Sequence, residues 1–232
     1  MDLNSKKVIV IGAGISGFAA AKLAKKLGAD VIMSDANEKV EEKHDLKPLR
    51  EAGIKIVLGK QTEELFEGAD LVIISPAVPR HIPILEKIGQ KVPVISEVEF
   101  AYKLAKAPIF AVTGTNGKTT TTMLLGELMK TVYGPYNVGV GGNIGTPLCE
   151  ECYRIGKDGC IVAEISSYQM EASSEFTTKG AAILNVTPDH LARHKTMDVY
   201  QAEKEKVFAH HTKDDFLVLN YDDERTRSMA QR

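Results

Sequence analysis

A glycine-rich loop between an apolar strand and a helix constrains the fold of this chain more than any other stretch. Residues 108–112 are apolar, residues 114–119 read GTNGKT, and residues 118–131 carry a helical pattern. Glycines let backbone N–H groups close around phosphate oxygens, and the helix N-terminus adds partial positive charge. The lysine can neutralise β- and γ-phosphates, and the threonine after it can ligate Mg²⁺. Although its spacing is shorter than the common G-x-x-x-x-G-K-[ST], the loop predicts a nucleotide-phosphate site in an α/β unit.

A second glycine cluster, near the N-terminus, has the spacing of a dinucleotide-binding turn. Gly12, Gly14 and Gly17 follow an apolar strand and open a helix, and Asp35 ends the next strand. This pattern is typical of proteins that bind NAD or FAD. The physical requirement is broader, because any nucleoside diphosphate fits a tight glycine turn at a helix N-terminus. An NAD-dependent oxidoreductase would explain this turn but would leave the ATP-type loop without a use.

Strand and helix patterns alternate along the chain, which predicts parallel sheets. In the first half we expect strands at 8–12, 31–34, 54–58, 71–74 and 94–95, and helices at 15–27, 40–52, 62–66, 82–88 and 97–105. In the second half we expect strands at 108–112, 160–165, 181–185 and 216–219, helices at 118–131 and 199–210, and a flexible glycine loop at 139–145. We therefore predict an α/β protein with a Rossmann-like parallel-sheet domain at 1–93, a linker at 94–107 and a truncated P-loop ATP-binding domain at 108–232.

Composition narrows the classes of partner. The chain has 29 Lys and Arg residues against 31 Asp and Glu residues, and it has no basic stripe, so nucleic acid is not the expected partner. No apolar run approaches the ~20 residues that cross a bilayer, and the N-terminus has no signal-peptide pattern. We expect the three cysteines to be free thiols in a cytoplasmic protein that does not insert into membranes.

Three further side chains are candidates for the chemistry. Glu164 ends an apolar strand beside the phosphate loop, where a carboxylate is well placed for Mg²⁺. His190 follows the strand at 181–185 and therefore leaves the sheet at the same edge. Lys204 lies on a charged amphipathic helix, and the sequence alone indicates a solvent-facing lysine there.

Several motifs together resemble the Mur ligases of peptidoglycan synthesis, and most of all the members that add D-glutamate. They are IGAGISG at 11–17, SPAVP at 75–79, TGTNGKTT at 113–120, GGNIGTP at 141–147, EISSYQME at 164–171, NVTPDH at 185–190 and YQAEK at 200–204. The motifs run in family order and cover nearly the whole chain. Folylpolyglutamate synthases share the phosphate loop, but typically as GTNGKGS and without the first glycine cluster.

The resemblance implies ATP-dependent amide formation between UDP-N-acetylmuramoyl-L-alanine and D-glutamate through an acyl phosphate, with two Mg²⁺ ions. It implies that the UDP moiety contacts Gly14, Ile15, Ser16 and Asp35, and that the rest of this substrate passes Asn143, Ser166, Gln169 and His190. ATP phosphates would be held by Gly114, Thr115, Asn116, Gly117, Lys118, Thr119 and Thr120. One Mg²⁺ would take Thr119 and Glu164, and the second would take His190 and a carbamylated Lys204. The implied catalytic residues are Lys118, Glu164, His190 and Lys204.

Three departures qualify this resemblance. Ala77 stands where the family often has glycine, near the expected uracil contact, and Ala192 stands where an aspartate is common. Family members are also far longer, so we expect a fragment without the C-terminal glutamate-binding domain, inactive but retaining the UDP-substrate and phosphate sites. The full-length form is expected to be a monomer. The alternatives are a non-catalytic UDP-sugar-binding fragment and an NAD-dependent oxidoreductase.

Overall fold

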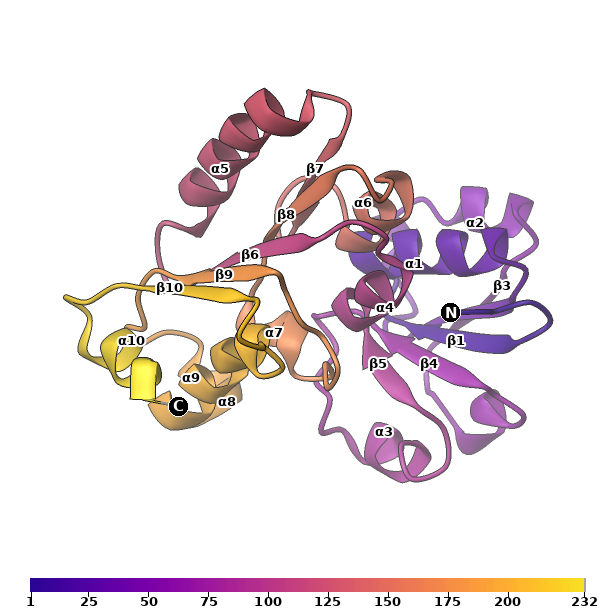
Figure 1. The fold of residues 1–232 in the computed structure, drawn as a ribbon. Helices are drawn as coiled ribbons and strands as arrows, with labels where there is room; N and C mark the ends of the chain where they lie inside the picture. The colour runs from indigo at the N-terminus through magenta and orange to yellow at the C-terminus, as the bar shows by residue number, and fades with distance from the viewer. Residues whose placement is uncertain (232) are drawn as a thin grey trace.

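The protein contains two parallel sheets of five strands each, joined and flanked by helices (Figure 1). The computed structural model describes residues 1–231. Every strand pairing in both sheets is parallel, which confirms the predicted α/β class.

The first sheet has the strand order β3-β2-β1-β4-β5. Its strands are β1 (Lys7–Ile11), β2 (Asp30–Asp35), β3 (Lys55–Leu58), β4 (Leu71–Ile74) and β5 (Val94–Ser96). Its helical segments are α1 (Ile15–Lys26), η1 (Val40–Glu42), α2 (Lys47–Glu51), η2 (Glu63–Phe66) and α3 (Pro83–Ile88). The central strand β1 is buried on both faces, as a parallel strand between helical layers requires.

The single helix predicted over residues 40–52 is wrong. The segment forms the short turn η1 and then α2, which has Pro48 in its first turn. Proline has no N–H and clashes with the carbonyl four residues earlier, so a helix restarts at a proline rather than running through it. The Asp45 carboxylate accepts a hydrogen bond from the Lys47 N–H at 2.9 Å, which stabilises the new start.

The second sheet has the strand order β10-β9-β6-β8-β7. Its strands are β6 (Ile109–Thr113), β7 (Val138–Gly142), β8 (Cys160–Glu164), β9 (Gly180–Ile183) and β10 (Phe216–Leu219). Its helical segments are α5 (Lys118–Tyr133), α6 (Leu148–Arg154), α7 (Ser167–Met170), α8 (Leu191–His194), α9 (Met197–Glu205), η3 (Lys206–Phe208), α10 (Glu224–Ser228) and η4 (Met229–Gln231).

The flexible loop predicted at 139–145 is also wrong over its first half, because Val138–Gly142 forms the edge strand β7. The glycines of β7 allow neighbouring atoms to approach the strand closely; they do not make it flexible. A Cβ at Gly139 would lie 2.7 Å from Glu151 Oε2, and one at Gly141 would lie 2.3 Å from the Thr146 backbone oxygen. Glycine is therefore required, because α6 and the turn between β7 and α6 approach the strand closely.

Helix α4 (Glu97–Leu104) lies between the two sheets (Figure 1). Its side chains form hydrogen bonds with segments that flank the second sheet. The buried Glu97 carboxylate accepts from the Cys149 N–H at 2.7 Å, at the start of α6. Glu99, also buried, accepts from three consecutive backbone N–H groups, those of residues 174–176. Residues 94–107, expected to be a linker, thus contain β5 and α4; the division into 1–93, 94–107 and 108–232 stays a prediction.

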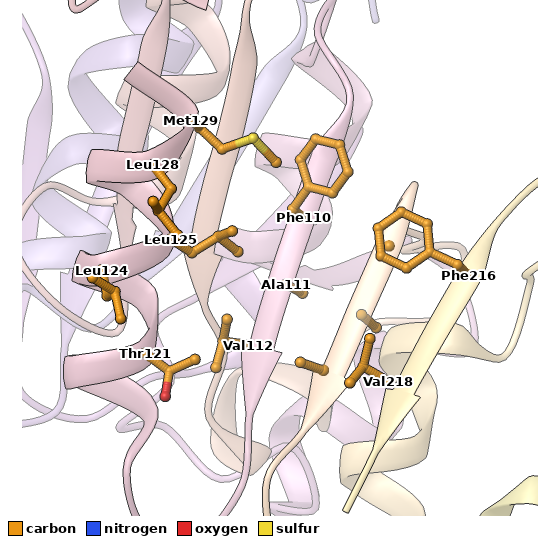
Figure 2. A pocket seen from close by; sticks show the side chains of 13 residues that line it. Phe110, Ala111, Val112, Thr121, Leu124, Leu125, Leu128, Met129, Phe216 and Val218 are labelled. Atoms are coloured by element: carbon orange, nitrogen blue, oxygen red, sulfur yellow. The ribbon is translucent and has the colours of Figure 1, made fainter. Parts of the chain in front are cut away.

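One face of the second sheet carries an apolar groove beside α5 (Figure 2). Leu124 and Leu128 of α5 form one side, and Phe216 and Val218 of β10 form the other. All four side chains are more than half exposed. Parallel sheets are normally covered on both faces, so this groove is unusually open.

Two further expectations concern the cysteines and the membrane. Cys149, Cys152 and Cys160 are free thiols and are all buried. Within residues 1–231, no helix has both the length and the hydropathy that a bilayer span requires.

Gly141→Ala tests whether β7 is a closely packed strand. The added Cβ would meet backbone rather than a movable side chain, so we expect the free energy of unfolding to fall by about 1–3 kcal/mol. Gly156→Ala is the matched control, because nothing lies within 4 Å of its added Cβ; it should change stability by less than about 0.5 kcal/mol. Urea unfolding followed by circular dichroism measures both, and equal stability of the two variants would contradict the packing described.

Candidate nucleotide and metal site

The predicted phosphate loop joins β6 to α5 at the carboxyl edge of the second sheet. Gly114 has φ +149° and Gly117 has φ +82°, so both occupy the backbone region that favours glycine. Gly117 is also the residue that precedes α5, a helix of 16 residues. The loop therefore presents the N-terminus of a long helix, whose free N–H groups and dipole suit an anion.

The Asn185 side chain forms hydrogen bonds with the backbone of the phosphate loop, a contact that sequence reasoning missed. Its Oδ1 accepts from the N–H groups of Thr115 and Asn116 at 3.1 and 2.8 Å, and its Nδ2 donates to the Asn116 oxygen at 3.1 Å. The signal was present in the NVTPDH motif, which begins with this residue. The Thr115 N–H also donates to the Asn185 backbone oxygen at 3.0 Å, so side chain and backbone together tie the loop to the segment after β9.

Lys118 lies at the start of α5 and is partly buried. Its Nζ donates to the Thr115 oxygen at 2.9 Å, so the ammonium folds back over the loop. This places a positive charge on the same side as the loop's N–H groups. The combination provides both hydrogen-bond donors and a cation for phosphate oxygens.

The parts of the chain built on the first sheet (β1–β5) and on the second sheet (β6–β10) form a first and a second unit. The Glu164 carboxylate is buried and joins three segments of the second unit. Thr119 Oγ1 donates to Glu164 Oε2 at 2.8 Å, and Asn143 Nδ2 donates to Oε1 at 2.7 Å. Glu164 is 1% exposed, and within residues 1–231 no Lys, Arg or His forms an ion pair with it. A buried carboxylate held only by neutral donors carries an uncompensated charge, which a cation at this place would balance.

The oxygen atoms of Thr119 and Glu164 fit Mg²⁺ better than a transition metal. Mg²⁺ is commonly held by one or two carboxylates together with substrate phosphates and water. Across residues 1–231, no three His, Cys, Asp or Glu side chains gather as a metal site. The described residues therefore fit an ion that is completed by a nucleotide rather than a preformed protein cage.

Lys204 is buried, which corrects the solvent-facing lysine that the sequence alone indicated. The residue is 2% exposed, its Nζ donates to the Gly114 oxygen at 2.8 Å, and Nζ lies 4.5 Å from the centre of the Tyr200 ring. Burial, reinforced by the positive charge of Lys118, lowers the pKa of Lys204 from 10.5 to about 7, although Asp189 opposes the shift. A substantial fraction of this amine is therefore neutral near pH 7.

His190 lies beside the same site on the turn after β9. Its φ of 55° is left-handed, and the residue forms the N-cap of α8. Its Nε2 lies 3.3 Å from Asp189 Oδ2, and its ring centre lies 4.8 Å from that of Tyr168. The side chain is 44% exposed and so remains accessible to a ligand.

Ser166 and Gln169 form a capping box at the start of α7. The Ser166 N–H donates to Gln169 Oε1 at 2.8 Å, and the Ser166 hydroxyl donates to the same oxygen at 3.0 Å. Next to them, the Ser167 hydroxyl lies 2.9 Å from Nε2 of the buried His194, a neighbour that sequence reasoning missed. The segment after Glu164 is therefore held by its own capping box and by the Ser167–His194 contact.

The first glycine turn lies at the carboxyl end of β1. Asp35 accepts from the N–H groups of Ala13 and Asn37 at 2.8 and 2.9 Å, so this carboxylate orders the turn itself. Ile15 is 71% exposed. A hollow beside Gly14 and Ile15 is also lined by Pro147 from the second unit, so the turn faces α6. The structure thus gathers the second-unit candidates around one loop and leaves the first-unit candidates at a separate turn; the binding roles of both groups stay predictions.

In comparisons with known proteins, two different family models match the two halves of the chain. The family model for the Mur ligase middle domain matches residues 112–232. The model for the C-terminal domain of alanine dehydrogenase/PNT matches residues 2–85.

Curated relatives match the whole chain. UDP-N-acetylmuramoylalanine–D-glutamate ligase of Thermoanaerobacter sp. (strain X514) is 45% identical over 233 residues, which cover 100% of this chain and 51% of that protein. The ligase of the same name from Pelotomaculum thermopropionicum is 46% identical over 229 residues, 98% of this chain and 50% of that protein. The chain thus spans about half the length of these relatives. Among solved structures, a pseudomurein peptide ligase type C from Methanothermus fervidus matches with 27% identity and a TM-score of 0.44, over 97% of this chain and 46% of that one.

Lys204→Met tests the buried amine through the pH dependence of stability. Between about pH 7 and 10.5 the unfolded chain binds more protons at Lys204 than the folded chain, so stability rises with pH across this window. Below pH 7 the cost of burying the charge is fully present, on the order of 3–5 kcal/mol. We therefore expect Lys204→Met to be more stable than the parent at pH 6, with the gain shrinking by pH 9.5. Urea unfolding in metal-free buffer measures it, and a gain that is independent of pH would exclude a depressed lysine pKa.

Proposed function

Since the chain belongs to the Mur ligase family, we propose that the whole protein is an ATP-dependent ligase that joins D-glutamate to UDP-N-acetylmuramoyl-L-alanine. Two curated relatives that match nearly all of this chain carry the name of that activity. The observation that carries the proposal is the buried Glu164 carboxylate, hydrogen-bonded to Thr119 at the head of a phosphate-type loop. That arrangement suits an Mg²⁺–nucleotide better than it suits hydride transfer.

The proposed reaction has two steps. The carboxylate of the substrate's alanine attacks the γ-phosphorus of ATP, which gives an acyl phosphate and ADP. The amine of D-glutamate then attacks the acyl carbon, and phosphate leaves as the amide forms. Phosphoryl transfer depends mainly on positioning and on stabilising charge as it moves between oxygens.

We assign ATP phosphates to the loop from Gly114 to Thr120. Lys118 releases the Thr115 oxygen and turns its ammonium to the phosphates, because a phosphate oxygen is a stronger, charged acceptor. Thr119 and Glu164 would hold one Mg²⁺, which neutralises phosphate charge when bound. Asn143 keeps the Glu164 carboxylate oriented through its 2.7 Å hydrogen bond.

We assign the second Mg²⁺ to His190 and to a carbamate on Lys204. The neutral amine is the form that adds CO₂, giving an N-carboxylate and releasing one proton, and the depressed pKa of Lys204 favours that form. The carbamate nitrogen keeps one N–H, so the hydrogen bond to the Gly114 oxygen can persist. Labelling with ¹³C-bicarbonate should give a carbamate carbon signal that is absent in Lys204→Met; the same signal in both proteins would exclude this site.

The UDP moiety is assigned to the first glycine turn, at Gly14, Ile15 and Ser16. Asp35 supports this turn through its hydrogen bond from the Ala13 N–H. The remaining substrate would pass Asn143, Ser166, Gln169 and His190 on its way to the phosphate loop. Because two of the three substrates, ATP and the UDP-linked one, are nucleotides, we assign the activity to the cytoplasm, and we expect a monomer.

NAD⁺ is a second candidate for the ligand that binds to the first unit. The alanine dehydrogenase/PNT match over residues 2–85 favours it, and the glycine turn is compatible with either diphosphate. An NAD-dependent enzyme would not need the Thr119–Glu164 arrangement. A non-catalytic UDP-sugar-binding role would need neither ATP nor D-glutamate.

Phosphate release tests the ligase proposal. We expect the full-length protein to release phosphate from ATP only when both UDP-N-acetylmuramoyl-L-alanine and D-glutamate are present. Lys118→Ala should lower this rate by at least about 100-fold, because a charged donor to the transferring phosphoryl group is lost. Lys130→Ala is the matched control on the same helix, since that lysine pairs only with Glu127 on the exposed face. Parent-like activity of Lys118→Ala would exclude the loop as the nucleotide site.

Residues 1–232 alone should bind ligands without turnover, because the relatives are about twice as long and positioning of both reactants supplies some 7–11 kcal/mol of the barrier. D-Glutamate-dependent phosphate release by this polypeptide would contradict that view.

Thermal shift distinguishes the two ligands of the first unit. A ligand at 100 times its Kd stabilises the folded state by about 2.7 kcal/mol, which is readily seen as a rise in Tm. We expect UDP-N-acetylmuramoyl-L-alanine to raise the Tm of residues 1–232 and NAD⁺ to leave it unchanged. A rise with NAD⁺ alone would favour the dinucleotide alternative.

A further inference from the structure

Arg193 of α8 reaches from the second unit to the first. Its Nε and Nη2 donate to the two carboxylate oxygens of Glu171 at 2.7 and 2.6 Å. The same guanidinium donates to the backbone oxygens of Val78 at 3.1 Å and Ala77 at 3.4 Å. Arg193 is 17% exposed and Glu171 is 9% exposed, so this is a largely desolvated, two-pronged ion pair with two further acceptors.

The loop that Arg193 contacts packs against the first glycine turn. Residues 75–79 read SPAVP and lie between β4 and α3, outside any helix or strand. A Cβ added at Gly12 would lie 2.8 Å from Ser75 Cβ and 3.0 Å from Val78 Cγ2. The Ser75 N–H also donates to the Ile11 oxygen at 2.9 Å. The position of this loop therefore determines the shape of one wall of the turn.

The same guanidinium of Arg193 also contacts a residue beside the phosphate loop of the second unit. It lies 4.3 Å from the centre of the Tyr168 ring. The Tyr168 ring in turn lies 4.8 Å from that of His190. Glu171 follows α7 directly, and α7 begins three residues after Glu164. One side chain thus connects the surroundings of Glu164 and His190 with the wall of the first glycine turn.

We propose that Arg193 is a positioning residue, which holds the 75–79 loop against α7 and α8 and so fixes the first glycine turn relative to the phosphate loop. The proposal rests on the proposed function, in which one substrate is held at the first turn and reacts at the second loop. Each ligand then binds mainly within one unit, whereas their mutual alignment depends on both. Loss of Arg193 should therefore impair the reaction far more than it impairs binding of ATP.

The first test does not depend on enzymatic activity. Hydrogen–deuterium exchange of the full-length protein should show faster exchange over residues 75–82 in Arg193→Ala than in the parent. Arg225→Ala is the matched control, because Arg225 also pairs with a carboxylate, that of Asp198 at 3.0 Å. Within residues 1–231 its side chain forms no hydrogen bond or ion pair with the first unit. Unchanged exchange over 75–82 in Arg193→Ala would overturn the proposal whether or not the protein is a ligase.

The second test separates alignment from binding. Arg193→Ala should lower kcat for phosphate release by about 10- to 100-fold, the effect of misplacing a reactant by about 1 Å. The Kd of an ATP analogue, measured by calorimetry, should stay within about twofold of the parent value, a change of less than about 0.5 kcal/mol. Arg193→Lys keeps the charge but not the two-pronged geometry, so it should not restore kcat. Full recovery with lysine, or weakened binding of the ATP analogue, would overturn a positioning role.

Discussion

The buried Glu164 carboxylate is the contact on which the second unit's site depends. It takes hydrogen bonds from Thr119 at the head of α5 and from Asn143 after β7, so it brings three separate segments to one point. Burying a charge without a cation costs free energy, and two neutral donors offset only part of that cost. At Glu164 this cost arises beside a loop suited to nucleotide phosphates, where a bound cation would remove it, and that is the physical basis for the proposed metal site.

Lys118 and Lys204 give the same site an unusual charge balance. One ammonium rests on the Thr115 oxygen at the surface of the loop, and the other amine rests on the Gly114 oxygen beneath it. Two cations so close would repel each other, and that repulsion adds to burial in depressing the pKa of Lys204. The buried lysine is thereby kept partly neutral, which a purely structural cation in a salt bridge would not be.

The sequence predicted most of the strands because buried parallel strands are short, continuous apolar runs, as in residues 8–11 and 160–163. It failed where an apolar pattern was missing or misleading. Strand β7 contains three glycines, of which Gly139 and Gly141 pack closely against Glu151 and Thr146 and Gly142 packs against the Glu164 backbone, so its composition resembles a loop. Lys204 was misjudged because α9 is charged along its length, and only the tertiary structure shows that one position faces the phosphate loop.

Candidate site residues were predictable where a motif carries the chemistry, as at Lys118, Thr119 and Glu164. The contacts of Asn185 and Arg193 were missed, although Asn185 begins the NVTPDH motif, because the backbone groups that these side chains meet lie far away in the chain. The first glycine turn was easy to recognise in the sequence, but its pattern does not specify one ligand. Its spacing matches a dehydrogenase model as well as a ligase motif, since the same backbone geometry accommodates different diphosphates.

The position of α4 has a consequence for recombining halves of related proteins. Glu97 and Glu99 satisfy backbone N–H groups of the second unit, and Ser96 just before them hydrogen-bonds Ser173 at 2.6 Å. A chimera spliced after α4 would separate these carboxylates from the N–H groups that they evolved to meet. A splice before Ser96 would keep them together but would divide β5, so the pairing of Ser96 with Ile74 of β4 would be the strand contact to be matched. By its hydrogen bonds, the part of the chain that would have to move as one piece begins with this helix rather than with the phosphate-loop strand β6.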